Sequence, residues 1–142
     1  MKRAWLWSCV LCLPLALHGM SAAAATRVIV VSGLGGDPEF EKRFEDWSAR
    51  TAEYAATAAG SSGSVTRIAG NAARADAIEA ALRAAASQLE AGDTFILVLI
   101  GHGSFDGNDY RFNIPGPDVT GTQLAAWLDR IPATVPQLVV NA

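Results

Sequence analysis

The chain has 142 residues, of which 51% are hydrophobic and 18% are charged, which is sufficient for one globular domain. Its formal charge is −3 and its pI about 5.2, so it offers no basic surface and no nucleic-acid partner is expected. Both cysteines, Cys9 and Cys12, lie in an N-terminal apolar segment, which leaves the rest of the chain without a thiol for a disulfide.

Residues 1–25 have the pattern of a secretory signal peptide. Lys2 and Arg3 give a basic start, Trp5–Leu17 form an apolar core, and Met20–Ala25 supply small residues for cleavage. The apolar run is short for a membrane span, and a retained anchor is the alternative. Cleavage removes two basic residues and no acid, so the charge changes from −3 to −5. We therefore expect a secreted or periplasmic protein that meets the membrane only through this segment.

The mature chain is expected to open with a strand, a glycine turn and a long helix. The β-branched run Thr26–Ser32 predicts the strand, and Gly33–Gly36 predict a tight turn. Asp37 is a suitable N-cap and Pro38 suits the first helical position. The helix should span residues 38–59, with one apolar stripe at helical spacing that comprises Phe40, Phe44, Trp47, Tyr54 and Ala58.

The middle of the chain predicts a second strand, helix and strand. Residues 64–69 form a weak strand, and residues 71–89 an alanine-rich helix with a core stripe of Ile78, Leu82, Ala85 and Leu89. The continuous apolar run Thr94–Ile100 is typical of a strand that is buried on both faces of a parallel sheet.

Residues 103–118 are expected to be irregular, with one small strand at 110–114. Thr120 and Gln123 match a capping box for a third helix, whose inward residues should be Leu124, Trp127, Leu128 and Ile131. The apolar run at 137–141 predicts a fourth, buried strand. Nothing in the sequence would cover that strand, so we expect the natural domain to continue with at least one more helix and strand.

This order of elements predicts a three-layer α/β/α fold with a parallel sheet and right-handed crossovers. With strand order 2-1-3-4, the first and third strands are neighbours at the switch point, where ligands bind. The loops at 33–37 and 101–107 would then face one crevice, with Asn141 and Ala142 beside His102. An imidazole there can act as general acid or base, and the Gly103 amide can bind an oxyanion.

The chain resembles the caspase-like cysteine peptidases, especially the legumain type, in two segments: VLIGHGS (98–104) and QLVVNA (137–142). In those enzymes a His-Gly pair follows one strand, and the catalytic cysteine follows the next long strand. The resemblance extends over residues 27–142 and implies a partial caspase-like α/β domain at 26–142. It implies that His102 is catalytic, that Gly103 supplies an oxyanion-hole amide, and that a cysteine follows Ala142. It also implies a peptide or protein substrate, without a cofactor or a metal.

Four residues are candidate substrate-binding groups because they lie in the two crevice loops: Gly35, Asp37, Ser104 and Asp106. Each also has a structural interpretation. Gly35 fits a turn, Asp37 fits a helix cap, and Asp106, like Asp109, fits a loop turn. Ser104 is not the nucleophile of a G-x-S-x-G elbow, because Gly103 occupies the serine position of that motif.

Three other functions compete with the peptidase. The same fold can hold a peptide or partner without catalysis, which is expected if no nucleophile follows Ala142. VLIGHGS also resembles the first strand and loop of sirohydrochlorin-type chelatases, but two strands precede it here and His102 has no second evident metal ligand. An α/β-hydrolase is suggested by the GLGG turn at 33–36, but the serine is misplaced for that class.

Overall fold

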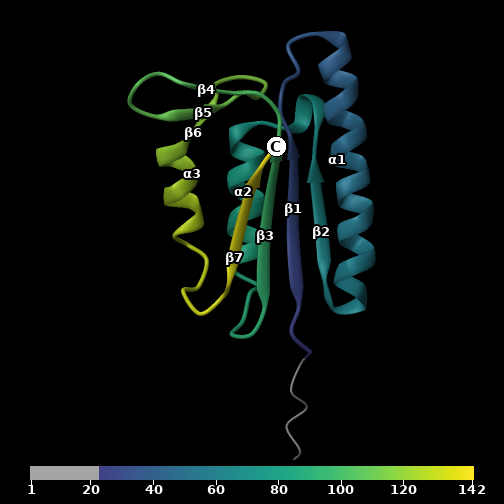
Figure 1. The fold of residues 1–142 in the computed structure, drawn as a ribbon. Coiled ribbons are helices and arrows are strands. Elements are labelled where there is room, and N and C mark those ends of the chain that lie inside the picture. Colours follow the sequence, from purple (N-terminus) through teal and green to yellow (C-terminus); the bar gives the residue numbers. More distant parts are fainter. Residues whose placement is uncertain (1–22) are drawn as a thin grey trace, which may run out of the picture.

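The structure is a computed structural model that describes residues 23–142, so the expected signal peptide lies almost entirely outside the described residues. Its main sheet has four parallel strands in the order β2-β1-β3-β7, which confirms the predicted order 2-1-3-4 (Figure 1). The strands are β1 (Thr26–Ser32), β2 (Ser64–Ile68), β3 (Thr94–Ile100) and β7 (Gln137–Asn141).

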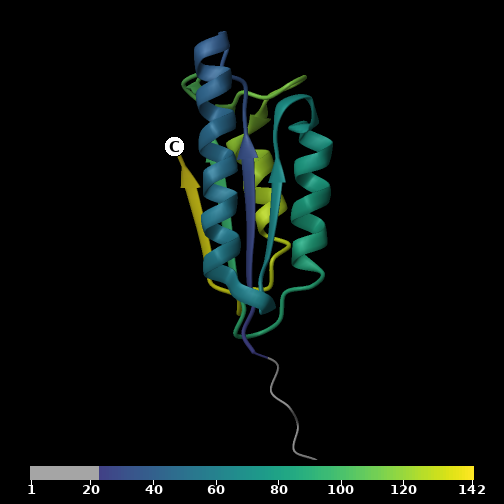
Figure 2. The same cartoon turned by 90° about the vertical axis from the view of Figure 1, so that its right-hand side faces the viewer.

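Helices cover both faces of this sheet, which makes the three predicted layers. Figure 2 shows α1 (Pro38–Ala59) and α2 (Ala75–Ala86) on opposite sides of it. Because side chains alternate along a strand, each central strand contributes to two cores. One core lies under α1 and comprises Val28, Val30, Phe44 and Ile100. The larger core lies under α2 and α3 (Gly121–Leu128) and includes Ile29, Val31, Ile78, Leu82, Phe95, Leu97, Leu99 and Trp127.

The first helix begins and ends as the sequence predicts. Asp37 Oδ1 accepts hydrogen bonds from the amides of Glu39 and Phe40, at 2.8 and 2.9 Å, and Pro38 occupies the first turn. Gly60 ends the helix with a φ of +62°, a conformation that glycine adopts without strain, and opens a short 3₁₀ turn, η1 (Gly60–Ser62).

The second helix is shorter than the predicted 71–89. A 3₁₀ turn, η2 (Gly70–Ala72), precedes it, and α2 starts only at Ala75. Gly70 has a φ of +56°, which directs the backbone away from an α-helical path before α2 starts. Leu89 lies beyond the end of α2 but remains buried in the larger core.

Strand β3, at the β7 side of the sheet, is less buried than expected. β3 buries Phe95, Leu97 and Leu99 against α2 and α3, whereas Ile96 and Val98 on its other face are only half-buried. The expectation of burial on both faces was therefore wrong for β3, whereas every residue of β7 is exposed, as expected for an apolar strand that nothing in the described residues covers. The reason is that α1 packs over β1 and β2, and β7 forms the edge of the sheet.

The predicted stripe on α1 is only partly a core stripe. Phe44 is buried, but Trp47 is 46% exposed and Tyr54 is 74% exposed, so the expectation that Trp47 packs internally was wrong. Tyr54 borders a hollow that Ile96 and Val98 of β3 also line, and Trp47 packs beside Phe44 of its own helix. The expectation of internal packing was correct for Trp127, which is the buried residue of α3.

A second, antiparallel sheet follows β3 where the sequence predicted an irregular loop with one strand. It comprises β4 (Gly103–Phe105), β5 (Tyr110–Phe112) and β6 (Val119–Thr120), in the order β4-β5-β6. The predicted strand at 110–114 is therefore β5, two residues shorter. The capping box between Thr120 and Gln123 forms as expected and starts α3. Among residues 23–142, no helix has the length and apolarity that a bilayer crossing needs.

Candidate functional site

The end of β7 and the residue after β3 lie side by side at one end of the sheet. The Ala142 amide donates to the Leu99 carbonyl at 2.9 Å, and the Gly101 amide donates to the Ala142 carbonyl at 3.0 Å. The β3–β7 pairing thus continues to Gly101, directly before His102. The predicted proximity of His102 to the end of β7 is therefore present.

His102 is exposed, and its imidazole packs against the first turns of α1. The ring centroid lies 4.8 Å from that of Phe40 and 5.0 Å from that of Phe44, both in edge-to-face geometry. Such contacts hold an aromatic ring in one orientation. The His102 carbonyl is also fixed, because it accepts a hydrogen bond from the Asn113 amide at 3.0 Å. The two phenylalanines therefore position the ring, and the residue as a whole stays exposed.

Gly103, at the start of β4, is in close contact with Tyr110 of β5. A Cβ atom at Gly103 would lie 2.5 Å from Cε2 and 2.6 Å from Cζ of the Tyr110 ring, so only glycine fits without a shift. The Tyr110 hydroxyl accepts a hydrogen bond of 2.9 Å from Asn141 Nδ2. Tyr110 therefore connects the segment after His102 with the last residue of β7.

The ladder between β4 and β5 leaves the Gly103 amide unused. In an antiparallel pair, bonded and non-bonded residue pairs alternate. The Asn113 amide donates to the His102 carbonyl, and the Asp106 amide donates to the Asp109 carbonyl, so these are bonded pairs. Gly103, which is opposite Phe112, falls in a non-bonded pair, and its N–H points away from β5. The Gly103 N–H is therefore available to a hydrogen-bond acceptor outside the β4–β5 ladder.

Gly35 and Asp37 lie at the same end of the sheet but are engaged in local structure. The Gly35 amide donates to Glu41 Oε1 at 2.9 Å, and a Cβ at Gly35 would lie 2.6 Å from the carbonyl carbon of Phe40. The Asp37 carboxylate caps α1, as described above. These contacts match the structural interpretation of both residues, because the glycine turn packs directly on the first turn of α1.

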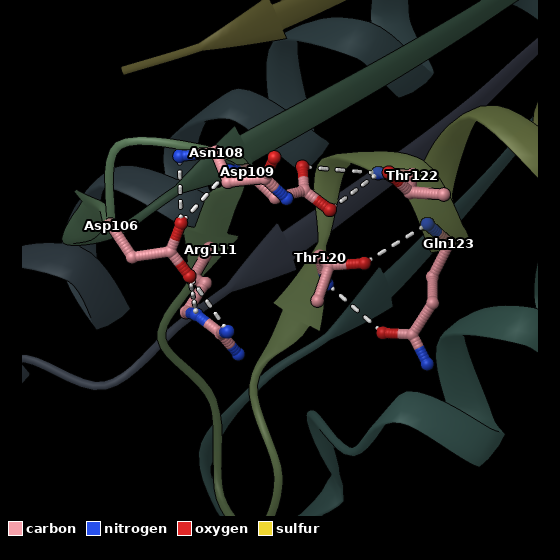
Figure 3. A network of polar contacts seen from close by, with 7 residues as sticks. All are labelled: Asp106, Asn108, Asp109, Arg111, Thr120, Thr122 and Gln123. Atoms are coloured by element: carbon pink, nitrogen blue, oxygen red, sulfur yellow. Dashed lines mark hydrogen bonds and ion pairs between the residues drawn. The ribbon is translucent and has the colours of Figure 1, made fainter.

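Asp106 organises the turn of the β4–β5 hairpin (Figure 3). Its Oδ1 accepts from the amides of Asn108 and Asp109, at 3.0 and 2.9 Å, and its Oδ2 pairs with Arg111 Nη2 at 2.8 Å. The Asp109 amide, then Arg111 and the Asn108 amide, lower the pKa of Asp106 to about 2. Ser104 is exposed on β4, opposite Arg111. The Asp106 carboxylate is thus committed to the hairpin.

Asp109 connects the same hairpin to α3. Its two carboxylate oxygens each lie 3.3 Å from the Thr122 amide in the first turn of that helix (Figure 3). Hydrogen bonds from Thr122, its side chain foremost, hold the pKa of Asp109 below the usual range. The hairpin that follows His102 is therefore fixed at both its turn and its base.

Sequence reasoning did not single out three residues around His102. Phe40 and Phe44 were interpreted as core packing and Tyr110 as part of a small strand, whereas Asn141 was expected beside His102 but without a contact to Tyr110. The position of Phe40, in the first turn of the helix that follows the glycine turn, could have indicated the contacts of Phe40 and Phe44 with His102. The amino-terminal end of a helix after β1 faces the switch point of the sheet. No such signal exists for the contact between Tyr110 and Asn141, which are 31 residues apart.

Two hollows in the described structure lie away from His102. One, of about 470 Å³, lies between α1 and β3, and its lining residues are all uncharged. The other, of about 330 Å³, lies between α2 and the start of β1 and β2, where Arg27 and Gln88 line it. Within residues 23–142, no three His, Cys, Asp or Glu side chains are grouped so that they could hold a metal ion.

The fold and the position of His102 define a parallel α/β protein with a candidate site at the switch point of its sheet. No family model matches the chain, and no curated protein matches it. Among solved structures, it is similar to protein GSU0716 from Geobacter sulfurreducens, at 23% identity and a TM-score of 0.58. The match covers 83% of this chain and 49% of that one, so the chain spans about half the length of GSU0716. This likeness shows a shared fold.

Proposed function

We propose that the protein is an exported cysteine-type peptidase of the caspase and legumain kind. The observation that supports this best is the hydrogen bond between the Gly101 amide and the Ala142 carbonyl, at 3.0 Å. The backbone that follows Ala142 would therefore continue beside Gly101 and His102. The resemblance of both segments to caspase-like peptidases makes cysteine the expected residue there.

The chemistry follows from the groups at this end of the sheet. His102 takes the thiol proton, and the thiolate attacks the scissile carbonyl. The Gly103 amide, which the ladder leaves unused, donates to the oxyanion of the tetrahedral intermediate. When the C–N bond breaks, His102 returns the proton to the leaving amine. Water then hydrolyses the acyl-enzyme, with His102 again as the base.

Two measurements test this proposal. The open reading frame should encode a cysteine within about five residues after Ala142, and a frame without one there rejects the cysteine mechanism. The full-length protein should cleave denatured casein, and His102→Ala should abolish cleavage. Tyr54→Ala is the matched control, because this exposed α1 residue lies far along the helix from Phe40 and should retain activity.

A non-catalytic binding protein on the same fold is the second candidate. It is favoured if the residues that follow Ala142 include no nucleophile. Peptide binding that survives His102→Ala, without cleavage by the unaltered protein, would support it. A chelatase-like role has less support, since His102 belongs to no group of three or more His, Cys, Asp or Glu side chains among the described residues.

Export is part of the proposal and has its own test. Amino-terminal sequencing of the protein recovered from the native host should begin near Thr26, after removal of the segment 1–25. Recovery of the intact amino terminus in a membrane fraction would instead indicate a retained anchor.

A further inference from the structure

Asp93 is a buried acid that the proposed mechanism does not use. It directly precedes β3, and only 8% of its surface is exposed. Its Oδ1 accepts a hydrogen bond of 2.7 Å from the Ala25 amide, and its Oδ2 accepts one of 2.9 Å from the Glu90 amide. These two bonds, the one from Ala25 foremost, hold the pKa of Asp93 below its usual range, and the nearby Arg27 guanidinium adds to the effect. None of the ion pairs among residues 23–142 includes Asp93, so neutral N–H groups are its direct partners there.

Ala25 joins the fold through both of its backbone polar groups. Its amide binds Asp93, and its carbonyl accepts a hydrogen bond of 2.8 Å from the Thr94 amide at the start of β3. Ala25 is half-buried, whereas the two residues before it are exposed. A chain that began at Thr26 would lack both hydrogen bonds and would leave a carboxylate oxygen in a buried site without this donor. Such a loss costs stability, because the buried group has already given up its hydration.

The sequence alone leaves open which bond is cut on export. Cleavage needs small residues shortly before the bond, as in the Ala-x-Ala pattern. The alanine run at 22–25 provides that pattern before Ala25 and again before Thr26. The two cuts differ in what they leave beside Asp93. A cut before Ala25 turns its amide nitrogen, 2.7 Å from Asp93 Oδ1, into a free amino group, and a cut one residue later removes that nitrogen.

We propose that the processing site is the peptide bond between Ala24 and Ala25, and that the new α-ammonium of Ala25 forms an ion pair with Asp93. The inference rests on the export proposed above, and it places the cut one residue before the boundary that the sequence pattern favours. Hydrolysis by the host's signal peptidase consumes one water. The C–N bond breaks, Ala24 is left with a carboxylate, and the Ala25 nitrogen becomes an ammonium group near neutral pH. Since Ala25 is only half-buried, water can accept from the N–H groups that Asp93 does not bind.

The pair makes the stability of the domain depend on processing. Before the cut, the Asp93 carboxylate receives a neutral N–H from Ala25, and after the cut it receives a positively charged one. Charge-assisted hydrogen bonds are roughly twice as strong as neutral ones. The processed domain is therefore more stable than the precursor, so that the folded state is favoured most strongly once the chain has been exported.

The first test identifies the amino-terminal residue. Intact-mass and amino-terminal analysis of the protein recovered from its native host should show a chain that begins Ala-Thr-Arg, at Ala25. A processed chain that begins at Thr26, or at any other residue, overturns this inference and leaves the proposed export and the peptidase activity standing. An intact amino terminus rejects export and this inference together, and it does not bear on the peptidase.

The second test measures the ion pair itself. Full-length forms that begin at Ala24, Ala25 or Thr26 can be released from an amino-terminal fusion by a protease that leaves no extra residue. The Ala24 form is the matched control, because it keeps the Ala25 amide and moves the charge away. The Ala25 form should melt roughly 2–4 °C above it. The Thr26 form should also melt below the Ala25 form, because it lacks both hydrogen bonds of that residue. Equal melting temperatures for the Ala24 and Ala25 forms would overturn the pairing.

A substitution of the acid shows whether Asp93 is the partner of the amino group. In Asp93→Asn the carboxylate charge is gone, so the Ala24 and Ala25 forms should melt at the same temperature. Asp76→Asn is the control, because it removes an exposed acid on α2 and should retain the difference. A difference that persists in Asp93→Asn would assign the effect to another group and overturn the pairing. If Asp93→Asn does not fold, the comparison of the Ala24 and Ala25 forms of the unaltered sequence decides.

Discussion

Gly103→Ala should destabilise the protein because Tyr110 occupies the space of the new methyl group. The Cβ would lie 2.5 and 2.6 Å from two ring carbons, well inside contact distance. Overpacking of this kind costs about 1–3 kcal/mol. Alanine restricts the unfolded chain more than glycine does, which offsets about 0.4–1 kcal/mol of this cost. The expected net loss in the free energy of unfolding is about 1–2 kcal/mol. Each kcal/mol lost should lower the melting temperature by roughly 4 °C.

A double-mutant cycle separates this cause from others. Urea unfolding, followed by far-ultraviolet circular dichroism, gives the free energy of unfolding for each variant. In a Tyr110→Ala background the added methyl group has room, so Gly103→Ala should cost almost nothing. In a Tyr110→Phe background both ring carbons remain, and the penalty should persist. An equal penalty in the alanine and tyrosine backgrounds would refute the steric explanation.

Three further predictions concern stability. Asp106 has a folded-state pKa of about 2, below the unfolded value of 3.8. Its contribution to stability is therefore present above about pH 4 and is lost as the pH falls toward 2. Melting temperatures measured as a function of pH should show this loss in the parent protein but not in Asp106→Asn. Thr120→Ala removes the N-cap of α3 and should cost about 1 kcal/mol in urea unfolding. Leu97→Ala should cost about 2–5 kcal/mol in urea unfolding, because Leu97 is fully buried. Val139, its partner on β7, is 43% exposed, so Val139→Ala should cost about 0.5 kcal/mol in the same assay.

The half-buried face of β3 is the main difference between the expected and the observed packing. The sequence predicted that nothing in this chain covers β7, and Leu138 of that strand is accordingly 53% exposed, but the continuous apolar run of β3 gave no sign that Ile96 and Val98 would be only half-buried. The position of α1 over β1 and β2 decides which strands are covered. That position depends on how the helix packs against the sheet, which no local pattern in residues 38–59 encodes.

The amino-acid sequence by itself determined the main elements, their order and the switch point. β-branched runs, the Asp37 and Thr120 caps and the glycine stops are local signals, because each depends on residues within one or two turns of chain. Alternation of strand and helix then restricts the sheet to parallel pairing. His102 could be placed at the end of β7 for the same reason.

Only the tertiary structure decided how the groups around His102 are oriented. β4 and β6 have three and two residues, too few for a recognisable period, so the small sheet could not be predicted. The contacts of Phe40 with His102 and of Tyr110 with Asn141 join residues far apart in the chain. Such contacts form only when separate elements pack together, and packing depends on the shapes of all the side chains between them.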